Sequence, residues 1–207
     1  MFNGASNFSH DVDSLFLFTL IVSVFFLVLI TGLMIYFVIK YNRKRNPKAT
    51  NFHGSTKLEI TWTLIPTILV LIMFWWGWKG YSKMSDIPEN AMTIDVTAQM
   101  WSWSFKYANG KVSDSLYVPV DKPIVLNLQS MDVVHAFYIP AFRIKKDVFP
   151  KQNRVVWFEA DEIGDYDIAC AEYCGLNHSY MYNKIKVVSE DDFSNWLYGS
   201  FDTETTK

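Results

Sequence analysis

The first long hydrophobic run covers residues 14–39, in which no side chain is charged. A second apolar run covers residues 58–78 and ends in Trp75, Trp76 and Trp78, rings typical of a membrane interface. At a rise of about 1.5 Å per residue, either run is long enough to cross a hydrocarbon core of about 30 Å. Pro66 removes one backbone hydrogen bond or kinks the second run. We predict two transmembrane helices, at about 14–39 and 58–78.

The segment between the two runs is strongly basic. By the positive-inside rule this loop faces the cytoplasm, so the N-terminal tail and everything after Ser82 lie outside it. The first 13 residues contain no Lys or Arg, so we do not expect a cleavable signal peptide. The six basic residues of the loop are Lys40, Arg43, Lys44, Arg45, Lys48 and Lys57.

After a linker at 83–91, the hydrophobic period changes from helical to two. Seven short segments rich in β-branched and aromatic residues are separated by Gly, Pro, Asn and Asp, which predicts a β-sandwich or barrel. Ser189 and the acids after it predict the start of a last helix that Gly199 can close. We therefore divide the chain into a membrane part, 1–82, and an extracytoplasmic part, 83–207. The expected strands are 92–98, 101–107, 124–129, 133–139, 155–160, 166–169 and 183–188.

The net charge of −2 hides an uneven distribution. Residues from Met84 onward include 18 acids and 11 bases, whereas the residues before it include three acids and eight bases. The asymmetry agrees with a membrane part followed by a soluble part. The acidic soluble part argues against nucleic acid as a partner and favours a basic protein.

The densest group of potential ligands is the segment Cys170-Ala-Glu-Tyr-Cys174-Gly-Leu-Asn-His178-Ser-Tyr-Met181. Thiolate and thioether donors favour copper, and imidazole suits it as well. A further ligand is expected from a distant strand, and His135 is the candidate. Two other interpretations remain open from the residues alone. The cysteines can form a small-loop disulfide, or they can bind zinc together with the two histidines, although zinc leaves Met181 unexplained.

This loop, the two hydrophobic helices, the segment LEITWTLIP and the segment HAFYIPAFRIKKD together resemble subunit II of bacterial-type haem–copper cytochrome c oxidases, over nearly the whole chain. The resemblance implies a two-helix transmembrane hairpin followed by an all-β, cupredoxin-like Greek-key sandwich that carries the dinuclear copper centre CuA. It implies that Cys170 and Cys174 bridge the coppers and that His135 and His178 each complete one. Met181 and the backbone carbonyl of Glu172 are then weak axial ligands.

The resemblance also assigns residues outside the copper ligands. The Glu172 side chain is expected to hold Mg or Mn shared with subunit I, a suitable role for a hard carboxylate oxygen. Trp101 is expected to receive electrons from a c-type cytochrome, although Trp101 and Trp103 are also ordinary candidates for the core. Glu59 is expected at the cytoplasmic mouth of a proton channel, although a first-turn acid also complements the helix dipole.

The segment around Trp101 departs from the family pattern, because Met100, Ser102 and Lys106 replace more usual residues. A soluble, a tethered or a complex-bound cytochrome therefore all remain candidate donors. Asp132, with Asp95, Asp114 and Asp121, is expected to form an acidic surface that steers a basic donor. The chain has no Cys-x-x-Cys-His motif, so we expect no haem in it.

The leading functional prediction is the subunit at which electrons enter a proton-translocating terminal oxidase of the bacterial inner membrane, with oxygen reduced in another subunit. Two alternatives are a CuA-bearing small subunit of a nitric oxide reductase and a non-catalytic copper carrier. Quinol oxidase subunits of this fold lack the copper ligands, and the intact ligand set argues against them.

Overall fold

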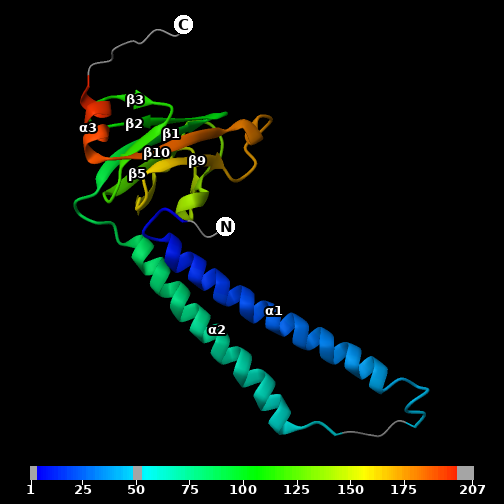
Figure 1. Ribbon diagram of the computed structural model, residues 1–207. Helices are drawn as coiled ribbons and strands as arrows, with labels where there is room; N and C mark the ends of the chain where they lie inside the picture. Colours follow the sequence, from blue (N-terminus) through cyan, green and yellow to red (C-terminus); the bar gives the residue numbers. More distant parts are fainter. Residues whose placement is uncertain (1–3, 49–52, 200–207) are drawn as a thin grey trace. The chain divides into compact units, whose positions relative to one another are not determined.

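The computed structural model describes residues 4–48 and 53–199 (Figure 1). Its chain contacts divide it into two units. One unit runs from Asp11 to Tyr81, and the other combines the described residues up to His10 with those from Ser82 onward. The predicted loop between the hydrophobic runs includes residues 49–52, which lie outside the described residues.

Two long helices, α1 (Ser9–Lys40) and α2 (Thr56–Ser85), account for both hydrophobic runs. Each contains a long apolar stretch in which no residue is buried, as expected for helices whose side chains face lipid or other proteins. The helix α2 continues through Pro66. Both helices extend beyond the predicted hydrophobic bounds, because polar and charged residues continue them at their ends.

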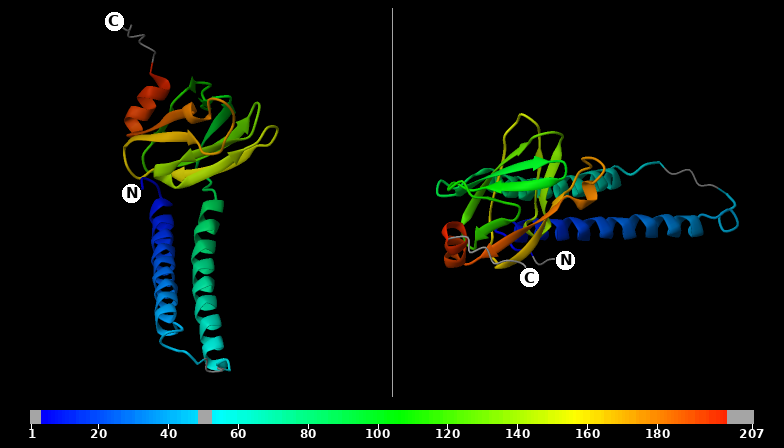
Figure 2. Two further views of the ribbon diagram at one scale, coloured as in Figure 1. Left: turned by 90° about the vertical axis from the view of Figure 1, so that its right-hand side faces the viewer. Right: turned by 90° about the horizontal axis from the view of Figure 1, so that it is seen from above.

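The second unit is a β-sandwich of two five-stranded sheets that pack face to face (Figures 1 and 2). The pair β1 and β5 and the pair β4 and β10 run parallel, and the other pairs are antiparallel. The first sheet has the order β3 (Val112–Ser113), β2 (Ser102–Lys106), β1 (Met92–Gln99), β5 (Pro123–Ser130) and β8 (Arg154–Glu159). The second has the order β4 (Leu116–Pro119), β10 (Tyr182–Val188), β9 (Gly164–Cys170), β6 (His135–Ile139) and β7 (Ile144–Val148).

Alternation of buried and exposed residues explains most of the strands. In β1, for example, Ile94, Val96 and Ala98 are buried while the residues between them face outward. The pattern predicted a sandwich or a barrel, and the structure confirms the sandwich that the family resemblance implied. Three strands were not predicted. Strand β7 has only its end residues buried and carries two lysines, while β3 and β4 are too short for a clear period. Strand β2 starts at Ser102 and not at Trp101, and β6 starts at His135 and not at Val133.

A short helix, α3 (Glu190–Tyr198), packs on the sandwich. The Ser189 hydroxyl accepts a hydrogen bond from the Asp192 N–H and caps its N-terminus. Phe193 is buried, and Trp196 stacks on Tyr117 with ring centroids 4.1 Å apart.

The N-terminal segment is part of the sandwich. The Ala5 N–H donates to the Ala141 carbonyl and the Asn7 N–H donates to the Glu159 carbonyl, both at 3.0 Å. The Phe8 ring is buried and meets Trp157 edge to face, with centroids 4.8 Å apart. The sequence division grouped these residues with the membrane part, because a tail of ten residues gives no periodic signal of its own.

We predict that Phe8→Ala destabilises the sandwich by about 3–5 kcal/mol, because it removes a buried ring and leaves a cavity. Amide hydrogen exchange of β8 in the full-length chain in detergent measures this effect as a lower free energy of opening. The control is Phe25→Ala, which removes an exposed ring from α1 and should leave β8 unchanged. Equal protection of β8 in the two variants would show that Phe8 does not stabilise the sandwich.

Candidate metal centre

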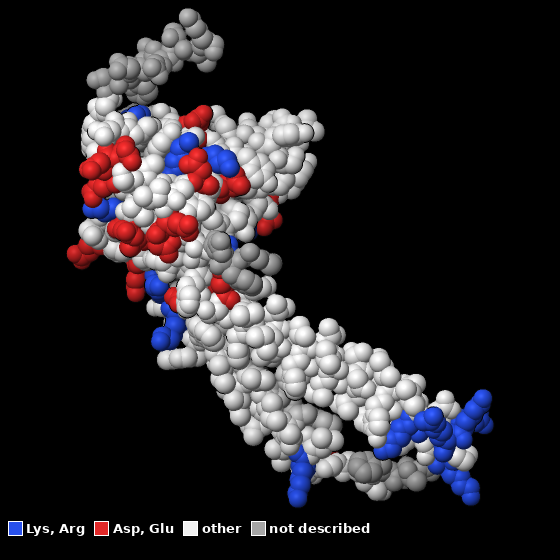
Figure 3. Space-filling view, in the orientation of Figure 1, with Lys and Arg blue, Asp and Glu red and all other residues white. Residues whose placement is uncertain are grey.

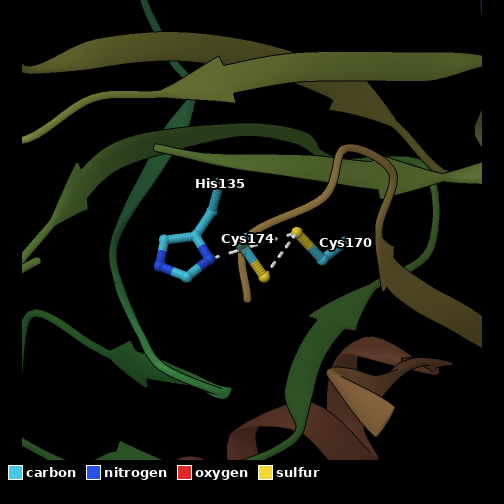
Figure 4. A group of neighbouring side chains, drawn as sticks. All are labelled: His135, Cys170 and Cys174. Carbon is cyan, nitrogen blue, oxygen red and sulfur yellow. Dashed lines mark hydrogen bonds between the residues drawn. The ribbon is translucent and has the colours of Figure 1, made fainter. Parts of the chain in front are cut away.

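His135, Cys170 and Cys174 meet inside one end of the sandwich. Figure 4 shows the imidazole and the two sulfurs converging on one point. Their potential ligand atoms all lie within 4.8 Å of one another, and all three residues are buried. Pairing of β6 with β9 places Phe137 opposite Cys170, which brings His135, at the start of β6, beside the end of β9. The tertiary fold therefore joins two stretches that are 35 residues apart.

The two thiols are free, with their sulfurs 3.6 Å apart. Burial, together with the neighbouring Cys170 thiol, raises the pKa of the Cys174 thiol to about 12. Two buried thiolates side by side require a compensating positive charge. A metal ion supplies this charge when it displaces the protons.

The loop from 171 to 181 adds three more donors around the sulfurs. His178 Nδ1 lies 3.6 Å from Cys174 Sγ, and the sulfur of Met181, which is fully buried, lies 3.8 Å from it. On the other side, Cys170 Sγ lies 3.3 Å from the Glu172 carbonyl oxygen and 4.0 Å from His135 Nδ1. Each sulfur thus has one imidazole and one weaker donor beside it. This double set fits a pair of copper ions that share both thiolates.

Backbone conformation allows the loop to take this path. Gly175 has φ +131°, a backbone conformation that residues with a side chain rarely adopt. A Cβ atom added there would also lie 3.2 Å from the Trp101 ring. The absence of a side chain after Cys174 therefore lets the indole of Trp101 lie directly against the loop.

Asp132 fixes the orientation of His135. Its Oδ1 lies 2.8 Å from His135 Nε2, which leaves Nδ1 facing the sulfurs. The carboxylate also accepts hydrogen bonds from the backbone N–H groups of Met100 and Val133, both at 2.6 Å. Burial alone would raise the pKa of Asp132, but the His135 hydrogen bond and the two N–H donors outweigh it and lower the pKa to about 2.

The sequence interpretation assigned Asp132 to a docking surface and missed this contact. The available signal was its position three residues before His135. A histidine that binds a metal commonly donates a hydrogen bond from its other ring nitrogen to a carboxylate.

The two tryptophans of this region occupy different environments. Trp103 is a core residue whose ring meets His135 and Phe137 edge to face, with centroids 6.0 and 5.1 Å apart. Trp101 precedes the strand, is half-buried against Gly175, and has no hydrogen-bond partner for its indole N–H among the described residues. Trp101 therefore contacts the 171–181 loop at the molecular surface, while Trp103 packs against the imidazole of His135 in the core.

The remaining predicted residues lie outside the donor cluster. The Glu172 side chain is exposed and forms an ion pair of 2.7 Å with Lys145, so its carboxylate points away from the sulfurs while its carbonyl faces them. Glu59 belongs to the helical unit, where it lines a shallow pocket on α2 with Thr56, Thr63 and Thr67.

Comparison with known proteins identifies similar chains over both units. Residues 1–76 match the family model "Cytochrome C oxidase subunit II, transmembrane domain", and residues 74–188 match "Cytochrome C oxidase subunit II, periplasmic domain". The chain is 27% identical to cytochrome c oxidase subunit 2 of Cereibacter sphaeroides, covering 87% of this chain and 73% of that one. It is 35% identical to the protein of the same name from Alkalihalophilus pseudofirmus, covering 84% of this chain but only 54% of that one.

Solved structures are similar to the sandwich. The periplasmic domain of subunit II of cytochrome oxidase from Bradyrhizobium japonicum superimposes with a TM-score of 0.51 and 33% identity, covering 54% of this chain and 94% of that one. A chain of a heme-copper terminal oxidase dimer, 22% identical with a TM-score of 0.50, covers 64% of this chain and 98% of that one and shares the fold.

We predict that Asp132→Ala lowers the copper affinity of the full-length chain by about 10- to 100-fold, because His135 loses the group that orients it. Competition of the purified chain against a copper chelator of known affinity measures the change. Asp95→Ala removes an exposed carboxylate from β1 and serves as the control. An Asp132→Ala affinity equal to that of the control would exclude this role for Asp132.

Proposed function

Since the chain belongs to the cytochrome c oxidase subunit II family, we propose that its sandwich holds the CuA centre at which electrons enter the enzyme. Cytochrome c oxidase is an oxidoreductase of the haem–copper terminal oxidase class, and this chain is its second subunit. The two apolar helices make it a membrane protein. The observation that carries the copper assignment is the pair of free, buried thiols 3.6 Å apart, each flanked by an imidazole.

The proposed ligands are the donors that surround this pair: His135, Cys170, the Glu172 carbonyl, Cys174, His178 and Met181. Zinc would be satisfied by two thiolates and two imidazoles in a tetrahedron. It would not account for the buried thioether of Met181 beside Cys174. A pair of copper ions held by these residues would supply one-electron chemistry.

The residues of the chain keep this centre rigid. His135 is held by Asp132 and by the ring of Trp103, and Met181 is fixed in the core. If the ligands do not move when the centre is oxidised or reduced, the reorganisation energy of electron transfer is small. The protein contributes this rigidity. Trp101 is the proposed point at which electrons arrive, because its ring contacts the residue that follows Cys174.

We propose that the sandwich and the N-terminus face away from the cytoplasm and that the basic loop faces it, in a bacterial inner membrane. The Glu172 carboxylate then binds Mg or Mn shared with subunit I, exchanging its present partner Lys145 for the metal. Glu59, at the first turn of α2, serves the cytoplasmic mouth of a proton channel. The donor is a c-type cytochrome, and haem in subunit I receives the electron.

A direct test is the electron paramagnetic resonance spectrum of the copper-loaded, full-length chain in detergent. A mixed-valent signal with the electron shared by two coppers supports the proposed function. A signal from one isolated copper per chain would contradict it and favour a copper carrier.

We predict that Cys174→Ser abolishes the shared-electron signal, because only one bridging thiolate remains. Met181→Leu should keep both coppers and shift the reduction potential, since it removes only a weak donor. Metal analysis and redox titration of both variants measure these effects. An unchanged dicopper spectrum in Cys174→Ser would refute the ligand assignment.

We predict that Glu172→Ala separates the two roles of this residue. The copper spectrum should persist, because the ligand to copper is the backbone carbonyl, whereas manganese bound at the contact with subunit I should be lost from the assembled oxidase. Manganese resonance spectra of complexes prepared with manganese in place of magnesium test this directly. The matched control is Glu190→Ala, an exposed acid in α3, which should retain manganese. Retention by Glu172→Ala would refute the assignment.

A further inference from the structure

Four loops form the end of the sandwich that carries the donor cluster. They are the segments 100–101, 131–134, 149–153 and 171–181. The Met131 N–H donates to the Ala98 carbonyl at 2.9 Å, and the Met100 N–H donates to Asp132. A β-bridge joins Ser130 to Pro150, and the Trp101 ring lies against Gly175. These contacts join the loops into one continuous surface around the candidate centre.

This surface is nearly neutral although the domain is acidic. Its loops contain two acids, Asp132 and Glu172, and one base, Lys151. Asp132 is engaged by His135, and Glu172 is paired with Lys145. In Figure 3 the acidic side chains gather over other parts of the sandwich, while the visible tip on the right, where Figure 1 shows the loop between β9 and β10, is white.

The acidic surface expected from the sequence does not form at this end. Asp95 lies in β1, opposite Lys106, and accepts a hydrogen bond from the Asn127 side chain. Asp121 follows β4, at the end of that strand away from these loops. Asp114 lies outside the four loops, beside the start of β10, where its backbone carbonyl accepts a hydrogen bond from the Asn183 side chain. Of the four acids expected, only Asp132 belongs to the four loops, and its carboxylate points inward.

The loops next to Trp101 instead expose apolar side chains. Met100, Met131 and Leu176 have 47%, 66% and 85% of their surface exposed, and we call these three residues the Trp101 rim. Leu176 directly follows the glycine that Trp101 touches. Grouped apolar side chains at the surface mark sites of interaction, and methionine adapts well to a partner surface. The same loops also expose Val133, Val134, Tyr173 and Tyr180.

Building on the proposed function, we infer that the Trp101 rim is the docking surface for an electron-donor protein whose own contact face is apolar and uncharged. Such a donor buries its apolar face against Met100, Met131 and Leu176 and brings its redox group close to Trp101. No unpaired acid in these loops is available to attract a strongly basic donor. Charge therefore contributes little to association, which depends on contact area and not on long-range steering.

The test uses the assembled oxidase and two oxidised c-type cytochromes, one with apolar, uncharged residues around its haem edge and one with a ring of lysines there. Isothermal titration calorimetry measures both dissociation constants at about 20 mM and about 300 mM salt. We expect the apolar probe to bind more tightly, with less than about a twofold change between the two salts and a negative heat-capacity change. Tighter binding of the basic probe, or a loss of more than about tenfold at high salt for the apolar probe, would overturn the inference.

Variants locate the contact. The pair Leu176→Ser and Met131→Ser should together weaken binding of the apolar probe by about tenfold. The matched control is Ile163→Ser, which removes an apolar side chain of 59% exposure before β9, at the opposite end of this strand from Cys170. Equal binding by the rim variant and the control overturns the inference, and so does failure of the rim variant to assemble, which would indicate that subunit I covers the rim.

Failure of this inference is distinguishable from failure of the proposed function. The dicopper spectrum and the reduction of copper by a small-molecule reductant are recorded before any cytochrome is added. If both are normal in the wild type and in the rim variant, a negative binding result concerns the docking surface alone. A wild-type oxidase without a dicopper signal on this chain contradicts the proposed function itself.

Discussion

The pairing of β6 with β9 is the constraint on which the site depends. Phe137 stands opposite Cys170, and the Ala171 N–H donates to the Ala136 carbonyl at 3.0 Å. This register sets His135 beside Cys170 at the end of the strand pair. A slip of one residue would turn the imidazole to the other face of the sheet and away from the sulfurs. The sheet therefore fixes one half of the donor set, while the loop that follows it fixes the other.

Ionising two buried thiols whose sulfurs lie 3.6 Å apart is energetically costly. Burial and the second thiol raise the pKa of Cys174, so this thiol loses its proton only when a cation replaces it. Asp132 and Trp103 hold the imidazole, and Gly175 leaves room for Trp101. Such preorganisation suits a centre that changes charge without moving its ligands.

Charge is distributed unevenly over the sandwich. The end that carries the donor cluster is close to neutral and exposes methionine, leucine and tyrosine side chains. Its two acids, Asp132 and Glu172, are engaged by His135 and Lys145. Acids elsewhere on the sandwich also form ion pairs, as Asp165 does with Lys186 and Asp167 with Lys184. An oxidase subunit with this surface is suited to a donor that recognises it by shape and apolar contact. Met100, one of the departures from the family pattern, is among the exposed apolar side chains of this end.

The sequence by itself determined the two hydrophobic helices, an all-β domain of sandwich or barrel type and the residues of the Cys170–Met181 loop, because these depend on local period and on spacing within a dozen residues. It named His135 only as a candidate, since its proximity to Cys170 depends on strand pairing. The tertiary structure alone decided that Asp132 faces inward, that Trp101 touches Gly175 and that Phe8 enters the sandwich. These contacts join segments that are distant in the chain. Local sequence patterns do not predict which distant segments the folded backbone brings together.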